Sequence, residues 1–208
     1  MFKYILKFFR SAIKSNPERI KLQFDQEVLK AFLFLVREYK FRVTLITPTL
    51  VKYESTYLII NVYHGRMSYE LGIETIRKGD FPESREQGFT LDELVALLGS
   101  QEDCYFQVST QKGVHLFVPK LAALFRKYAE QILKTYDSKI FDKLWEQRLY
   151  FRKKFAEEVE LRHVREKAQD AWNKKDYLKI VILYNPIKHL LSQVELKKLE
   201  YAEKKTKT

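Results

Sequence analysis

The residue types best suited to chemistry gather around one predicted turn between two strands. An imidazole, a guanidinium and a carboxylate that converge at a strand end can transfer a proton or hold a polar ligand. The residues of this candidate interaction or polar site are His64, Arg66, Tyr69 and Glu70. Their spacing matches no catalytic signature, and Asn61, an odd number of positions before His64, belongs on the opposite face of a regular strand. A structural turn, with Arg66 and Glu70 as a surface ion pair, is therefore the favoured interpretation.

No other group of side chains predicts an enzyme. Cys104 is the single cysteine and has no neighbouring histidine, and His115, His163 and His189 stand alone. The chain carries no Walker loop, GxGxxG, HExxH or GxSxG pattern, and no Cys/His cluster spaced like a structural metal site. The sequence therefore predicts no catalytic residue, no cofactor and no metal ion. A lone cysteine also favours a reducing compartment, so we expect a cytoplasmic protein.

The predicted turn belongs to the chain's clearest β-sheet. Between Phe41 and Ile76, apolar and polar residues alternate in several segments, and residues 57–64 are rich in β-branched and aromatic side chains. Short turns join these segments, so we predict an antiparallel meander of four strands, with 57–64 at its centre and 104–108 as a fifth strand. We expect nearly all of the following residues to be buried beneath a helix over 25–39: Val43, Leu45, Ile60, Val62, Leu71 and Ile73.

Helical patterns flank the predicted sheet. A capping box of Thr90 and Glu93 predicts a helix over residues 91–98, and Pro119 predicts the first turn of a helix that runs to about Tyr136. Residues 138–172 fit one long helix or two helices with a break near His163. The sequence thus predicts an α+β protein: N-terminal helices, a central meander of four to five strands packed by helices, and a helical C-terminal portion. We expect an α+β domain over 1–136 and a helical region over 137–208.

The first residues form a basic amphipathic segment. Lysine and arginine recur at helical spacing over residues 1–14, and aromatic and aliphatic residues occupy the other sides. Such a segment suits peripheral contact with a membrane surface, although its broad apolar face favours packing on the domain. Nowhere does an apolar run reach the roughly 20 residues of a membrane-spanning helix, so we predict no transmembrane segment.

Positive charge concentrates at the two helical ends of the chain. The formal net charge is +11, while the predicted sheet region is slightly acidic. A surplus of this size favours polyanions, although it is also a common way to keep a protein in solution. Glutamates are interleaved in the same predicted helix, which is more typical of a solvated face. The residues of this candidate basic surface are Arg148, Arg152, Lys153 and Lys154.

Two resemblances appear in the sequence. Ala168, Ala171, Asp176, Tyr177 and Tyr184 occupy positions similar to those of one tetratricopeptide unit, but lysine replaces the usual glycine and one copy cannot form a solenoid. This similarity implies a helical hairpin only. The stretches TLVKYES, VYHGRMSYELGIE and DYLKIVILYNPIKHLLSQVELKKLEYAEKK resemble a group of uncharacterised bacterial cytoplasmic proteins. That resemblance implies bacterial origin and cytoplasmic location, and it implies no chemistry.

These patterns lead to three functional hypotheses. The absence of catalytic motifs and the abundance of aromatic residues favour a non-enzymatic protein-interaction module, of the immunity-like or regulatory kind that binds a partner protein. The alternative is a nucleic-acid-binding protein that uses the basic C-terminal helix. An enzyme of unrecognised type is the third. The salt dependence of nucleic-acid binding separates the first two, and a protein partner remains our leading expectation.

Overall fold

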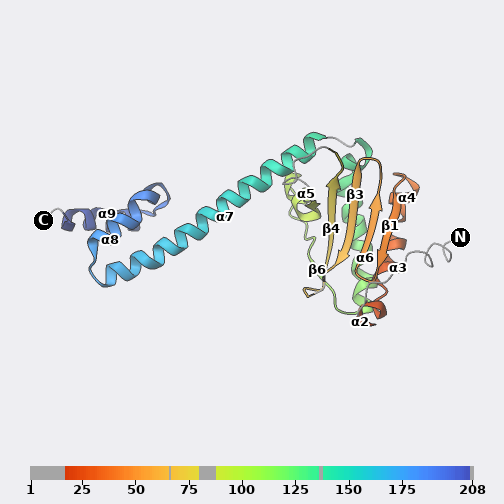
Figure 1. Ribbon diagram of the computed structural model, residues 1–208, viewed down its shortest axis with the longest axis horizontal. Coiled ribbons are helices and arrows are strands. Elements are labelled where there is room, and N and C mark those ends of the chain that lie inside the picture. The colour runs from red at the N-terminus through yellow and green to blue at the C-terminus, as the bar shows by residue number, and fades with distance from the viewer. Residues whose placement is uncertain (1–16, 66, 80–87, 136–137, 207–208) are drawn as a thin grey trace. The chain divides into compact units, whose positions relative to one another are not determined.

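The structure is a computed structural model that describes residues 17–65, 67–79, 88–135 and 138–206. The chain forms two compact units, Met1–Gln147 (unit 1) and Arg148–Thr208 (unit 2). Helix α7 (Ser138–Asn173) begins in unit 1 and ends in unit 2, so the change of unit falls within a helix (Figure 1). The division into 1–136 and 137–208 expected from the sequence stays a prediction.

Unit 1 contains the predicted antiparallel sheet. Its four main strands follow one another along the sheet as they do along the chain, and two short strands both pair with the fourth (Figure 1). This confirms the α+β class and the meander. The strand predicted over 104–108 is present as only two residues, Phe106–Gln107, and the short strand Phe89–Thr90 was not predicted. The strands are β1 (Arg42–Thr47), β2 (Leu50–Glu54), β3 (Leu58–His64), β4 (Glu70–Arg77), β5 (Phe89–Thr90) and β6 (Phe106–Gln107).

Helices α3 (Phe24–Ala31) and α6 (Gln111–Thr135) cover one face of this sheet (Figure 1). The residues expected on that face of β3 and β4 are fully buried, as predicted: Ile60, Val62, Leu71 and Ile73. Short helices α2 (Pro17–Lys21), α4 (Leu33–Arg37) and α5 (Leu91–Leu97) complete the unit. The predicted capping box of Thr90 and Glu93 is present at the start of α5.

The helix predicted over 25–39 is wrong as a single helix, because it breaks at Phe32. The Phe32 backbone leaves helical geometry at φ −96° and ψ 15°, and separate helices lie on either side. Its side chain is fully buried against the rings of Tyr53 and Phe125. Burial of an aromatic ring is worth more than the helix propensity of one residue, so packing decides the local backbone here.

The start predicted for the next long helix is also wrong. Helix α6 begins at Gln111, and Pro119 lies inside it. The side-chain oxygen of Thr110 accepts a hydrogen bond from the amide of Gly113 at 3.1 Å, so a threonine cap starts the helix. Pro119 has no amide to donate, and the helix continues through it because buried side chains on both sides, including Val118 and Leu121, hold it on the core.

Leu45 departs from the predicted core for a different reason. Register between β1 and β2 shifts between Val43 and Leu45, so Leu45 pairs with Lys52 and not with a core residue. A β-bulge adds one residue to a strand and turns the following side chains to the other face. Both Val43 and Leu45 are half-buried, and Val43 packs against the core from the edge.

Unit 2 consists of the rest of α7, α8 (Tyr177–Tyr184), the 3-10 helix η2 (Asn185–Leu190) and α9 (Gln193–Thr206). α7 is one helix, without the alternative break near His163. Asp176 caps α8 by accepting from the amide of Lys179 at 3.1 Å, and Ser192 and Glu195 form a capping box at the start of α9. The small core of this unit is Ala168, Ala171, Ile180, Tyr184, Ile187, Leu191, Leu199 and Ala202.

In the described parts of the chain, no helix is both long enough and apolar enough to cross a membrane. The basic segment at residues 1–14 lies outside the described residues, and its contact with a membrane surface stays a prediction.

Candidate functional site

At the end of β3, His64 lies in a buried polar cluster whose second member, Arg19 of α2, is 45 positions away in the chain. The Arg19 Nη1 is 3.0 Å from Nδ1 of His64, and its Nη2 donates to the carbonyl of Gly65 at 3.0 Å. His64 Nε2 is 2.7 Å from the carbonyl oxygen of Val108. Only 1% of His64 and 6% of Arg19 remain exposed. The cluster ties α2, the β3–β4 turn and the segment before α6 together.

These contacts fix the protonation of His64. A carbonyl only accepts and a guanidinium only donates, so Nε2 carries the proton toward Val108 while Nδ1 accepts from Arg19. Burial lowers the pKa of His64, and the charge of Arg19 lowers it further against the opposing pull of the Val108 carbonyl. Both ring nitrogens are thus occupied in a neutral, buried imidazole. Such a ring holds structure together and has no nitrogen left for a substrate.

Tyr69 closes this cluster from the solvent side. Its ring lies 3.9 Å from the Arg19 guanidinium carbon, a cation–π contact, and packs edge-on against His64 with 5.9 Å between ring centroids. The Tyr69 backbone has a left-handed φ of 55°, which is uncommon for a residue with a side chain. The amide of Val108 donates to the Tyr69 carbonyl at 2.7 Å, a bond that holds this conformation in place.

The remaining members of the predicted cluster lie elsewhere. Glu70 precedes Leu71, the strand partner of His64, and therefore lies on the opposite face of the sheet. Glu70 lines a cavity of about 190 Å³ together with Tyr63, Asp92 and Cys104, and buried residues of the core face also line this cavity. Arg66 lies outside the described residues. The structure thus brings His64 and Tyr69 together and separates them from Glu70, and an interaction role for the four residues stays a prediction.

Cys104 in this cavity is poorly placed to act as a nucleophile. Burial raises the pKa of its thiol, and the negative charges of Asp92, Asp103 and Glu102 raise it further. Reactive cysteines need the opposite setting, with positive charge that favours the thiolate. The cavity therefore offers a neutral thiol among carboxylates.

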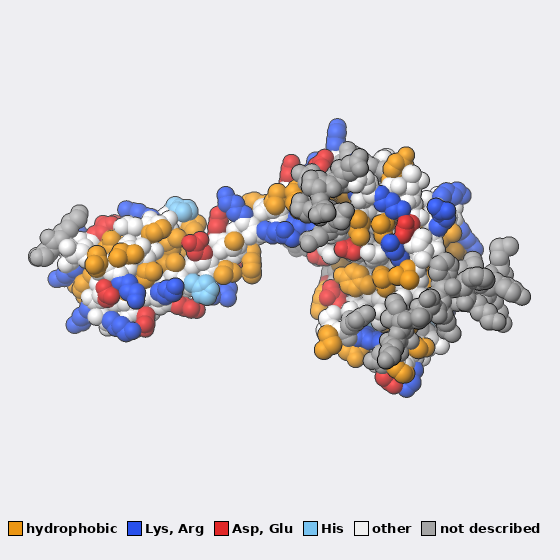
Figure 2. Space-filling model, in the orientation of Figure 1, with side chains coloured by type: hydrophobic (Ala, Val, Ile, Leu, Met, Phe, Trp, Pro, Cys, Tyr) orange, Lys and Arg blue, Asp and Glu red, His pale blue; other side chains and the backbone are white. Residues whose placement is uncertain are grey.

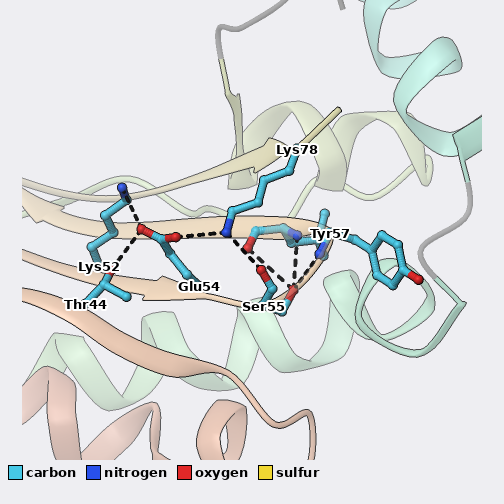
Figure 3. Close-up of polar contacts among 7 residues, drawn as sticks. Thr44, Lys52, Glu54, Ser55, Tyr57 and Lys78 are labelled. Carbon is cyan, nitrogen blue, oxygen red and sulfur yellow. Dashed lines mark hydrogen bonds and ion pairs between the residues drawn. The ribbon is translucent and has the colours of Figure 1, made fainter. Parts of the chain in front are cut away.

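A second polar network lies on the face of the sheet opposite α3 and α6 (Figure 3). Glu54 accepts from Lys52 and Lys78, both at 2.8 Å, and from the hydroxyl of Thr44 at 3.0 Å. Hydrogen bonds from Lys52 and Lys78 lower the pKa of Glu54 to about 2. Lys78 also donates to the carbonyl of Ser55 at 2.9 Å. With three donors on one carboxylate, this network links β1, β2 and the end of β4 and leaves Glu54 little capacity as a base.

Unit 2 carries an open pocket lined by aromatic rings, the aromatic pocket, defined by Trp172, Tyr177 and Tyr201. Ring centroids of the three are 5.6 to 6.2 Å apart, in tilted and edge-on pairs. They line a pocket of about 590 Å³ together with Val194 and Asn173. This volume lies within the usual range for ligand sites.

Lysines complete the lining of the aromatic pocket. Lys175, Lys197 and Lys198 line it, and no acidic side chain does. The Lys198 ammonium lies 5.3 Å from the centre of the Trp172 ring, and Lys205 lies 5.8 Å from that of Tyr201. Hydrophobic and basic side chains gather side by side on this unit (Figure 2). The sequence suggested only Tyr177, through its tetratricopeptide-like position; α9 brings Tyr201 to Trp172 in a way no local pattern reveals.

The predicted basic surface lies at the start of the part of α7 that belongs to unit 2. Arg152, Lys153 and Lys154 are exposed and Arg148 is half-buried. Nearby, Arg165 is engaged within unit 2, where its Nε and Nη2 donate to the two oxygens of Glu195 at 2.6 and 3.0 Å. This bidentate pair lowers the pKa of Glu195 to about 2 and joins α7 to α9.

Comparisons with known proteins add no assignment. The chain matches no protein-family model, no curated protein and no solved structure. Within the residues that the structure describes, no group of three or more His, Cys, Asp or Glu side chains is arranged to hold a metal ion.

Proposed function

We propose that this protein is a non-enzymatic protein-interaction module and that its binding site is the aromatic pocket of unit 2. The observation that carries the proposal is a cluster of the half-buried Trp172 and Tyr177 with the exposed Tyr201, which lines a pocket together with three lysines. Tryptophan and tyrosine are the residues most enriched at the energetic centres of protein interfaces. A partly exposed cluster of three such rings can serve as the anchor site for a partner.

The lining selects the chemistry of the partner. Three lysines and no carboxylate favour a negatively charged segment, while the rings and Val194 favour an apolar side chain. The site therefore suits a peptide segment in which acidic residues flank an apolar anchor. The anchor enters the pocket, and its carboxylates meet Lys175, Lys197 and Lys198.

Ring geometry favours a peptide over a nucleic-acid base. Bases bind aromatic side chains by stacking on an open ring face. Here Trp172, Tyr177 and Tyr201 pack against one another edge-on or tilted, and Lys198 and Lys205 lie over two of the rings. These contacts take up part of the ring surface on which a base would stack. An apolar side chain needs only the concave apolar surface that the pocket provides.

Trp172 gives this proposal a direct readout. The chain has two tryptophans, so Trp145→Phe leaves Trp172 as the sole tryptophan reporter in the full chain. The probe is a short tryptophan-free peptide in which Asp and Glu flank a Leu-Phe pair. We expect its addition to change Trp172 fluorescence to saturation and Lys197→Gln with Lys198→Gln to weaken binding about tenfold.

A matched control removes the same charge elsewhere in unit 2. Lys179→Gln with Lys188→Gln deletes two lysines that do not line the pocket and should leave the affinity unchanged. The proposal is overturned if the peptide produces no saturable signal, if both lysine pairs weaken binding equally, or if a peptide with lysine in place of Asp and Glu binds as well.

Nucleic-acid binding is the second candidate, favoured by the exposed basic run on α7. If Lys153 and Lys154 contact phosphates, affinity for a labelled duplex or single strand falls with salt, with a slope of roughly 0.7 to 0.9 per contact on a log scale. Fluorescence anisotropy at two salt concentrations measures this slope. Submicromolar binding at physiological salt that is lost in Lys153→Gln with Lys154→Gln, with helicity intact, would rank this function first.

The setting of the module follows from its sequence resemblance and remains part of the proposal. Similarity to bacterial cytoplasmic proteins supports a bacterial cytoplasmic origin. An immunity-like or regulatory role fits a small module that binds an acidic segment of another protein and blocks it. Identification of the protein bound in the native host, by photocrosslinking from a probe placed at Val194, tests this role.

A further inference from the structure

Two polar residues of the aromatic pocket are joined by a side chain that does not line it. Gln169 of α7 donates from Nε2 to Oδ1 of Asn173 at 2.9 Å, and its Oε1 accepts from the ammonium of Lys198 at 3.1 Å. Asn173 and Lys198 both line the pocket, and they belong to different helices. The three side chains thus form one chain of hydrogen bonds, the carboxamide relay, with Gln169 at its centre.

Gln169 lies between two further contacts that join α7 to α9. One helical turn before it, Arg165 makes its bidentate pair with Glu195. One turn after it, Trp172 packs against Tyr201 with 5.7 Å between the ring centroids. The contact positions on each helix are three or four residues apart, so each set lies on one side of its helix. The two helices are therefore held together on both sides of Gln169.

The direction of each hydrogen bond in the carboxamide relay follows from the chemistry of lysine. An ammonium only donates, so the oxygen of Gln169 must face Lys198 and its NH2 group must face Asn173. An NH2 group only donates as well, so Asn173 must present its own oxygen to Gln169. The NH2 group of Asn173 is then available to a partner, because no described residue accepts a hydrogen bond from it.

We infer that Gln169 is a positioning residue that makes the aromatic pocket select a carboxylate over a carboxamide. The inference rests on the proposed function and specifies how the pocket recognises the acidic residues of its partner. Lys198 and Asn173 are both bonded to Gln169, and they offer an ammonium and an NH2 group as donors. Both oxygens of a carboxylate accept hydrogen bonds, so it can satisfy both donors. The carboxamide of a partner Asn or Gln has one oxygen and brings a competing NH2 group.

Gln169→Glu tests the inference because it reverses the outer half of the carboxamide relay. A carboxylate accepts from both neighbours, so Asn173 should turn its NH2 group toward position 169 and its oxygen toward the pocket. The probes are the acidic Leu-Phe peptide and a neutral version with Asn and Gln in place of Asp and Glu. Trp172 fluorescence in the Trp145→Phe chain measures both affinities. The unaltered site should bind the acidic peptide about tenfold more tightly than the neutral one.

The neutral peptide separates the relay from a simple effect of charge. In Gln169→Glu the acidic peptide should weaken about tenfold, and the neutral peptide should bind more tightly than it binds the unaltered site. An added negative charge alone would weaken only the acidic peptide. Asn185→Asp makes the same exchange of amide for acid at an exposed position of unit 2 outside the pocket, and it should change neither affinity. When Asn173→Ala is also present, Gln169→Glu should no longer strengthen the neutral peptide.

The possible results distinguish this inference from the proposed function. If the neutral peptide binds Gln169→Glu and the unaltered site equally well, the role of Gln169 is overturned and the proposed function stands. Equal affinities of the two peptides for the unaltered site overturn the selection of a carboxylate. Absence of a saturable signal from either peptide overturns the proposed function and, with it, this inference. Circular dichroism on each variant confirms that its helices are intact.

Discussion

Both units of this protein place a lysine or arginine over an aromatic ring, yet the two contacts differ in what surrounds them. In unit 1, Arg19 lies over Tyr69 and its guanidinium also bonds His64 and Gly65 in a buried cluster. In unit 2, Lys198 lies over Trp172 beside an open pocket. The same kind of cation–aromatic contact therefore has a different role in each unit. Burial with every polar atom satisfied makes a structural tie, and exposure leaves a surface that a partner can use.

The two units should differ most in what their aliphatic side chains contribute to the free energy of unfolding. Ile60 is fully buried in the sheet of unit 1, and Ile182 is 63% exposed on unit 2. Ile60→Ala should reduce the free energy of unfolding by about 2 to 5 kcal/mol, because it leaves a cavity in a packed core. Ile182→Ala should change it by less than about 0.5 kcal/mol. Urea denaturation of both variants checks this, and equal losses would contradict the assignment of core and surface.

The two cation–aromatic contacts should also differ in how much they contribute to stability, and this difference should be smaller than that between Ile60 and Ile182. Arg19→Leu leaves Nδ1 of His64 and the Gly65 carbonyl without their donor, which should cost about 1 to 3 kcal/mol of stability. Lys198→Leu removes an exposed cation and should change stability by less than about 0.5 kcal/mol. Thermal denaturation followed by circular dichroism measures both. A similar drop in melting temperature for the two variants would refute the distinction.

A pH effect from a buried histidine should appear in unit 1. His64 is held neutral with a lowered pKa in the folded state, whereas the unfolded chain binds that proton at about pH 6.5. Below that pH the unfolded state therefore holds more protons, and stability falls as the pH drops. The stabilising contribution is complete above about pH 6.5 and is lost toward the lower folded pKa. Denaturation midpoints at about pH 8 and about pH 5.5 should differ in the original chain and converge in His64→Asn.

The smallest expected effect on stability concerns the polar network around Glu54. Glu54→Gln weakens contacts with Lys52 and Lys78 that are partly open to solvent, so it should cost less than about 1 kcal/mol near neutral pH. The pKa of Glu54 is lowered to about 2, so its contribution is present above about pH 4.5 and declines as the pH falls toward 2. Acid titration followed by circular dichroism should show a smaller loss of stability with falling pH in Glu54→Gln than in the original chain.

Alternation of side chains predicted the sheet well, because period-two patterns reflect burial on one face. It failed at Leu45, where a β-bulge changes the face of the sheet toward which the side chains point. No residue type in the sequence predicts this bulge. Packing also overrode local signals at Phe32, whose buried ring breaks a helix, and at Pro119, which the core holds inside one. The capping box predicted at Thr90 was correct, since its hydrogen bonds are entirely local.

The candidate sites were harder to predict because they depend on contacts between distant residues. His64 was singled out for its type, but its partner Arg19 lies in another helix, and the pair could not be inferred from spacing. Trp172 and Tyr201 meet only because α9 returns to the end of α7. In both cases the sequence did not show how far the side chains are exposed to solvent. A sequence shows which residues can act, and the fold decides which of them meet solvent.

The most direct test of this contrast measures stability and peptide affinity on the same two variants, Arg19→Leu and the Lys197→Gln, Lys198→Gln pair. The account predicts that Arg19→Leu lowers the denaturation midpoint and leaves the affinity for the acidic probe peptide unchanged. The lysine variant should keep the midpoint and weaken the peptide about tenfold. The account is contradicted if Arg19→Leu weakens the peptide under conditions where the protein is folded, or if the lysine variant binds it with the original affinity.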